Sequence, residues 1–220
     1  MGISKEKNEI KVSVPPKQPP EPFTLKEIQA IVEKFGSDPE LQHFLDYLKV
    51  KFCTGLPIGE VAAWRRRHCS SECDRIWIGE TLTGSGENRK PKAAKRNKNR
   101  TVPLTLQLQK LLLNRRPEAW QTEQKDDPIF SSVEGCTINC KNFCNRYWKP
   151  ALADFGSDYR KPYMTQHSVI FHALESGMNP VGFAALTEHG VRTLYERYAG
   201  IVNPPQLPEL LPLFSSCDDS

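Results

Sequence analysis

Apolar residues recur every three to four positions along most of this chain, which is the spacing of one face of an α-helix. An amphipathic helix ending at Gly55 is predicted by five residues at this spacing: Leu41, Phe44, Leu45, Leu48 and Phe52. Thr24 and Glu27 match the capping box, which favours a helix start, and predict a helix over 25–35. Pro57 suits a first helical turn, where its missing N–H costs little, and predicts a helix over 57–67. Further helices are predicted at 106–115, 137–153, 165–176, 181–187 and 191–199.

Two segments instead have the composition of β-strands. They are RIWIGETL (75–82) and NRTVPL (99–104), and a polar loop joins them. We therefore expect an α+β fold that is mainly helical, with a small antiparallel β-hairpin. One domain is expected over 21–202, preceded by a disordered lysine- and proline-rich lead-in (1–20) and followed by a proline-rich acidic tail (203–220).

Composition excludes several protein classes. The chain is 38% hydrophobic and 25% charged, as expected for a globular protein. No apolar run approaches the roughly 18 residues that a membrane span needs, and the first residues lack the apolar core of a signal peptide. We expect no membrane association and a cytoplasmic location, with nucleoid association if the protein is bacterial.

The positive charge of the chain is concentrated in one region. The net charge is only +4, but 65–100 holds eleven Lys and Arg against four acidic residues. The remainder holds 19 basic and 22 acidic residues. A basic region on a near-neutral body is typical of a nucleic-acid-binding protein, and the alternative is a solvated loop.

The seven cysteines do not form a recognisable framework. An odd number without a secretory signal argues against a disulfide scaffold. Cys136, Cys140 and Cys144 are four residues apart, which is not the usual spacing of zinc ligands, although His68, Cys69 and Cys73 are conceivable partial ligands. We predict structural thiols, with Cys140 and Cys144 on one helix face, and no metal.

The segment 161–200 contains the most specific candidate chemistry. His189 precedes Tyr198 by nine residues, which would place the two on opposite faces of a continuous helix. Gly190 offers a helix stop between them, so Tyr198 can turn back toward the pocket that holds His189. A tyrosine nucleophile beside a histidine suits phosphoryl transfer.

Four segments in order resemble boxes of the tyrosine recombinase (phage integrase) family. They are CTGLPIGEVAAW (53–64), RNKNRTVPL (96–104), DPIF (127–130) and PYMTQHSVIFHAL (162–174), followed by the Tyr198 segment. DPIF resembles a strand of that family. The resemblance covers about 20–202 and implies the catalytic-domain fold, DNA as partner, and a role in DNA recombination or integration by mobile elements.

The resemblance also implies site residues. Tyr198 matches the nucleophile, His189 the second histidine, Glu60 the acid of the first box, and Lys95 the hairpin lysine, with Lys92 and Lys98 as alternatives. No metal and no nucleotide or other small-molecule cofactor is implied. The expected DNA-contacting residues of the basic region are Arg89, Lys90, Lys92, Lys95, Arg96, Lys98 and Arg100.

The sequence departs from the family where the phosphate should be held. Pro57 and Gln166 stand at the positions of two arginines that grip the scissile phosphate, and Tyr163 stands where a histidine is usual. Glu188 replaces a glycine and would repel phosphate. Loss of one such donor costs about 10²–10³ in rate. Five other arginines are candidate substitutes: Arg65, Arg66, Arg67, Arg160 and Arg197.

Three functions remain open at this point. The favoured one is a degenerate, recombinase-like DNA-binding protein (a pseudoenzyme), acting alone, as a homo-oligomer, or with an active recombinase. The second is an active enzyme that forms a 3′-phosphotyrosine through Tyr198. The third is an interaction module or evolutionary remnant that acts through a partner, with the tail as a docking peptide. His167 and His172 are expected to be core or surface residues.

Overall fold

The computed structural model describes residues 21–83, 90–93, 99–115, 125–154, 156, 158–187 and 190–198. Its helices are α1 (Leu25–Ser37), α2 (Leu45–Thr54), α3 (Ile58–Ala62), α4 (Leu106–Asn114), α5 (Cys140–Asn142), α6 (Lys149–Asp154), α7 (Met164–Glu175), α8 (Pro180–Thr187) and α9 (Val191–Tyr198). The 3₁₀ turns Gln42–Phe44 and Arg66–His68 and a π-helical turn, Phe143–Trp148, complete the helical elements of these residues.

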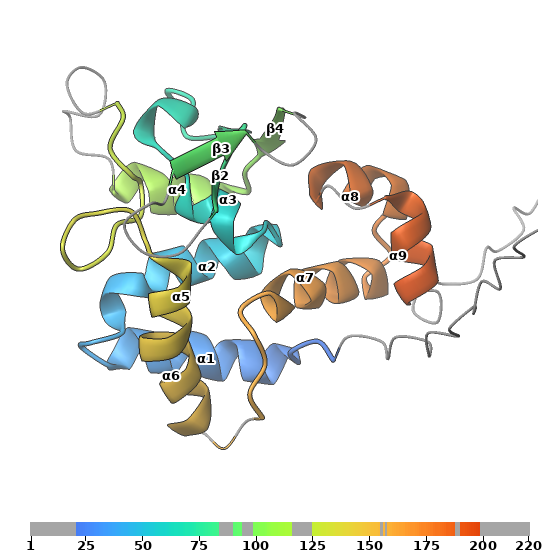
Figure 1. Ribbon diagram of the computed structural model, residues 1–220. Helices are drawn as coiled ribbons and strands as arrows, with labels where there is room; N and C mark the ends of the chain where they lie inside the picture. The colour runs from blue at the N-terminus through green and yellow to red at the C-terminus, as the bar shows by residue number, and fades with distance from the viewer. Residues whose placement is uncertain are drawn as a thin grey trace, which may run out of the picture.

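The strands form two short antiparallel pairs. Strand β1 (Arg75–Ile78) pairs with β4 (Arg100–Pro103), and β2 (Glu80–Thr83) pairs with β3 (Lys90–Ala93). The mainly helical α+β fold with a small antiparallel sheet is therefore confirmed. Figure 1 shows the strands and α4 on one side of the molecule, α1, α5 and α6 on the other, and α7 extending between them toward α8 and α9.

Two helix ends lie where short sequence motifs predicted them. Thr24 accepts a hydrogen bond from the Glu27 N–H, and the Glu27 carboxylate accepts from the Thr24 N–H at 2.8 Å, which confirms the predicted capping box. Helix α2 ends at Gly55, which has the left-handed φ of 63° that glycine adopts without strain.

Several element predictions were wrong in extent or type. The helix expected over 137–153 starts only at Cys140 and contains the π-helical turn Phe143–Trp148. The helix expected over 57–67 ends at Ala62, because the Arg66 and Arg67 N–H groups bond to the Asp127 and Lys125 carbonyl oxygens. The strand expected at 127–130 forms only an isolated bridge, Arg65 to Pro128. The strand expected over 75–82 is interrupted at Gly79, so that its two halves pair with different partners.

The apolar side chains form two separate clusters. The larger one fills the space between α1, α2, α6 and the sheet, and its fully buried side chains include Trp64, Trp148, Tyr47 and Phe35. The smaller one lies between α7, α8 and α9 and consists of Ile170, Leu174, Phe183, Ala184, Leu194 and Tyr198. Tyr198 thus belongs to a small cluster at the end of the molecule where α8 and α9 pack (Figure 1).

Candidate functional site

The turn between α2 and α3 carries Pro57, which the sequence resemblance placed at the position of an arginine. Two side chains of α2 hold this turn from inside: the Lys51 ammonium donates to the Leu56 carbonyl oxygen at 2.7 Å, and the Tyr47 hydroxyl donates to the Ile58 carbonyl oxygen at 3.2 Å. Pro57 is the N-cap of α3 with φ −53°, a value that its ring prefers. Lys51, Tyr47 and the backbone preference of proline therefore hold this turn in place.

The start of α7 lies directly against that turn. A Cβ on Gly55 would lie 3.1 Å from the Val169 side chain and 3.7 Å from the Gln166 carbonyl oxygen. This close approach favours glycine and brings the turn that contains Pro57 close to the backbone of Gln166, the other residue expected at an arginine position. Gln166 and His167 are both buried.

Tyr198 is bonded to His167. The phenol oxygen of Tyr198 and Nδ1 of His167 share a hydrogen bond, and each residue is only 2% exposed. Tyr163 lies one helical turn before His167, and its half-exposed ring contacts the His167 ring edge-on with centroids 4.6 Å apart. The structure thus brings Tyr163, His167 and Tyr198 together at the junction of α7 and α9.

The environment of Tyr198 opposes its ionisation. Burial raises the pKa of the phenol above its ordinary value, the nearby Tyr163 raises it further, and the exposed Arg197 partly offsets the rise. A phenol is a stronger nucleophile as phenolate, so this pocket favours the less reactive form.

A buried ion pair links three other elements beside the site. Nη2 of Arg100, on β4, lies 2.6 Å from the Glu60 carboxylate on α3, and Nε of Arg100 donates to the Leu186 carbonyl oxygen on α8 at 3.1 Å. The side chain of Arg100 is only 12% exposed. Its guanidinium therefore points into the protein, whereas the sequence suggested a contact with DNA.

Several expected site residues lie outside the part of the chain that the structure describes. They are His189, Glu188, Lys95, Arg89, Arg96 and Lys98. The backbones of Lys90 and Lys92 form part of β3, but their side chains are not described.

The other arginines considered as substitutes have partners elsewhere or face solvent. Arg65, Arg66 and Arg67 make ion pairs with Glu80, Asp127 and Asp126. Arg160 pairs with Glu27 and stacks over the Phe23 ring at 4.0 Å. Arg197 is exposed on α9. These contacts engage the first four guanidinium groups with partners other than Tyr198, and three of those arginines belong to the basic region.

Sequence reasoning missed two residues of this site. His167 was assigned no role, although its position four residues after Tyr163 placed the two on one helix face. Lys51 was not considered, although it falls in the apolar stripe of α2 together with Tyr47 and Leu48. A lysine within an otherwise apolar helix face is the sequence signal that would have identified Lys51 as a buried residue. Burial lowers the pKa of Lys51 to about 7, against the raising effects of Cys140 and Glu60.

The cysteines that were expected on one helix face pack at the edge of the main core. Cys140 and Cys144 are half-buried there, and the Cys144 thiol lies 3.1 Å from the Tyr159 hydroxyl. Among the described residues, no three His, Cys, Asp or Glu side chains gather as metal ligands would. None of the described helices has the length and apolar character to cross a membrane.

Comparisons with known proteins identify the fold. No protein-family model matches the chain, and no curated protein matches its sequence. Solved structures do match. The Tn1549 transposon integrase in complex with a circular intermediate DNA superimposes with a TM-score of 0.70 at 15% identity, covering 83% of this chain and 62% of that one.

Two further solved structures agree. XerA recombinase matches with a TM-score of 0.61 at 17% identity, covering 84% of this chain and 61% of that one. The catalytic domain of bacteriophage HP1 integrase matches with a TM-score of 0.57 at 14% identity, covering 83% of this chain and 88% of that domain. The chain therefore has the fold of a tyrosine recombinase catalytic domain. It spans about three fifths of the Tn1549 integrase and XerA chains.

Proposed function

We propose that this protein binds DNA through a recombinase catalytic-domain fold and does not cleave it efficiently. The observation that supports the proposal most strongly is the proximity of the two segments that carry uncharged residues at the expected arginine positions: a Cβ on Gly55, in the turn of Pro57, would lie 3.7 Å from the carbonyl oxygen of Gln166. The domain extends over 21–202 in this proposal.

The missing charges matter because of what an arginine supplies. A guanidinium is permanently charged and forks onto two phosphate oxygens, whereas proline offers no donor and a glutamine amide is neutral. Losing one such donor costs about 10²–10³ in rate, and an arginine finger contributes about 10³–10⁵. Gln166 retains an amide that can bond to phosphate, which aids binding more than catalysis.

The state of Tyr198 supports the same proposal. Its hydroxyl is engaged by His167 and its pKa is raised by burial, so attack on a phosphate requires the phenol both to leave this bond and to lose its proton. A side chain that is 2% exposed also has no route to a DNA backbone without movement of α9.

DNA binding is supported by the remaining positive charge. Arg65–Arg67 and Arg100 are ion-paired within the protein, so the candidates for contact with DNA are the basic residues of 89–98, a segment with six Lys and Arg and no acidic residue. Its strand β3 lies in the sheet, and the Tn1549 integrase of similar fold is complexed with DNA. DNA, with a second copy or an active recombinase on the same site, is the proposed partner.

Binding of a duplex oligonucleotide at increasing salt tests the proposal. Lys92→Glu with Lys95→Glu should weaken binding and flatten the plot of log K against log salt by about 2, because each phosphate contact contributes about one unit of slope. Lys26→Glu with Lys141→Glu makes the same change in net charge on exposed helical positions and should leave the slope unchanged. DNA binding that does not depend on salt, or an equal loss of DNA affinity in the two double variants, would contradict the proposal.

A second candidate function is an active recombinase, favoured by the histidine that contacts the phenol of Tyr198. In that case the phenol of Tyr198 passes its proton to His167 and attacks the scissile phosphorus. A 3′-phosphotyrosine bond forms, the bond from phosphorus to the 5′-oxygen breaks, and the 5′-oxygen leaves and takes a proton. A nicked suicide substrate should then trap a covalent adduct with the wild-type protein that is absent in Tyr198→Phe. No adduct after prolonged incubation contradicts this candidate.

A further inference from the structure

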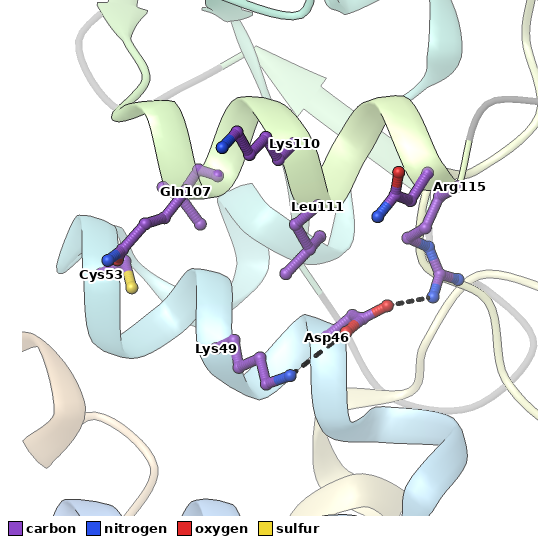
Figure 2. Close-up of a pocket in the computed structure, with 9 residues that line it drawn as sticks. Asp46, Lys49, Cys53, Gln107, Lys110, Leu111 and Arg115 are labelled. Atoms are coloured by element: carbon purple, nitrogen blue, oxygen red, sulfur yellow. Dashed lines mark hydrogen bonds and ion pairs between the residues drawn. The ribbon is translucent and has the colours of Figure 1, made fainter.

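A groove separates α2 from α4, and its lining includes no residue of α7 or α9. Its volume is about 590 Å³, and residues of both helices line it. Figure 2 shows Leu111 pointing from α4 toward α2 and Gln107 pointing toward Cys53. Leu108 and Leu111 give the groove an apolar strip, and Cys53 opens to solvent at its edge.

The rim of the groove carries a positive excess. Lys49, Lys110 and Arg115 line it together with a single carboxylate, Asp46. Asp46 is already bonded to Arg115 at 2.8 Å and lies 4.0 Å from Lys49 (Figure 2). Lys110 is exposed and has no ion-pair partner among the described residues. The groove therefore suits a ligand that combines apolar side chains with negative charge.

One segment of this chain has that composition. The sequence 203–220, NPPQLPELLPLFSSCDDS, contains four leucines and a phenylalanine, three acidic residues and no Lys or Arg. The opposite terminal segment, 1–20, holds four lysines against two glutamates and would be repelled. Charge complementarity thus selects 203–220 over 1–20.

The segment is long enough to reach the groove within one molecule. From Tyr198 to Cys217 the chain has 19 residues, which span at most roughly 60 Å when extended. A folded domain of this size has a radius of gyration of about 16 Å. A path around the surface is therefore available, with slack.

We propose that residues 203–220 bind in the α2–α4 groove of their own molecule. Leucines of the segment cover the strip formed by Leu108 and Leu111, and its carboxylates lie near Lys49 and Lys110. This contact does not depend on whether the protein binds or cleaves DNA.

Two native thiols provide a direct test with the full chain. A short bis-maleimide, applied at low protein concentration, should join Cys53 to Cys217 within one molecule, as shown by peptide mass mapping of the monomer band. Cys136 is also exposed, but it lines a different pocket beside α5, so its link to Cys217 is the matched control. The Cys53 link should exceed the Cys136 link by about tenfold or more, because a bound segment holds its thiol near one site.

Charge reversal tests the same contact. Lys110→Glu should lower the Cys53–Cys217 yield about fivefold, whereas Lys141→Glu, an equally exposed lysine on α5, should not change it. Thermal unfolding of both variants checks that the groove is intact. Equal links to Cys53 and Cys136, an unchanged yield in Lys110→Glu, or a product found only in covalent dimers would each overturn the proposal.

Discussion

The hydrogen bond between His167 and Tyr198 is the contact that decides how the candidate nucleophile is held. Both groups are buried, so removal of the His167 ring takes a buried hydrogen-bond partner from the Tyr198 hydroxyl. Leaving a buried polar group unsatisfied costs about 1–3 kcal/mol. Burial, with a further contribution from Tyr163, raises the pKa of the phenol and so keeps it protonated, and Tyr198 packs in the small cluster of α7, α8 and α9.

A double-mutant cycle on this pair should therefore show coupling. His167→Ala should destabilise the protein by about 1–3 kcal/mol, and Tyr198→Phe should be less damaging in the His167→Ala background than in the wild type, with a coupling of about 0.5–3 kcal/mol. Urea unfolding measures both. Tyr195→Phe, on the exposed face of the same helix, should change stability by less than about 0.5 kcal/mol. Additive effects of His167→Ala and Tyr198→Phe would show that the bond is absent.

Lys51 makes stability depend on pH near neutrality. Burial lowers the pKa of its ammonium from 10.5 to about 7 in the folded protein, so between pH 7 and 10.5 the unfolded chain binds the extra proton. Stability should then rise with pH above 7, by at most about 1.4 kcal/mol per pH unit. Below pH 7 both states are protonated and this dependence disappears.

Lys51→Met isolates that effect. Urea unfolding between pH 7 and 9 should give a smaller slope of stability against pH for the variant than for the wild type. An equal slope in the two proteins would contradict the assignment of the lowered pKa to Lys51.

At the scale of elements, the Glu60–Arg100 pair joins α3, β4 and α8. Its side chains are 4% and 12% exposed, so removing one partner leaves a buried charge. Arg100→Met should lower stability by about 3–5 kcal/mol, and adding Glu60→Gln should restore part of the loss. Thermal unfolding is the measurement, and Arg75→Met, which removes an exposed partner of Asp74, is the control. A cost for Arg100→Met no larger than that for Arg75→Met would contradict this role.

The elements also show what the sequence could predict. Helix ends marked by local chemistry, such as Thr24 with Glu27 and Gly55, lie where they were expected, because those signals act within a few residues. The extent of α3 and the strand expected at 127–130 were predicted wrongly, because the bonds that decide them join Arg66 and Arg67 to 125–127, some sixty residues later. Non-local pairing of this kind leaves no mark in local periodicity.

At the scale of the whole molecule, the positions of Lys and Arg in the sequence did not show which of these side chains form ion pairs within the protein. Arg65–Arg67 and Arg100 contribute four of the eleven basic residues of the basic region, and all four are ion-paired within the protein. Three of their carboxylate partners, Asp126, Asp127 and Glu60, lie outside that region, and the fourth, Glu80, lies within it. The mainly helical fold, by contrast, followed from periodicity and from the order of the family boxes.

In the proposed function, the recombinase fold of this chain holds a phosphate site that has lost two fixed charges, at Pro57 and Gln166. The most direct measurement is covalent adduct formation with a suicide DNA substrate by Pro57→Arg with Gln166→Arg, compared with the wild type and with the same pair in a Tyr198→Phe background. The account predicts adducts in the restored protein alone, because Pro57 has a backbone conformation open to arginine and Gln166 lies beside that turn. Adducts in the wild type at a rate equal to that of the restored protein would contradict it.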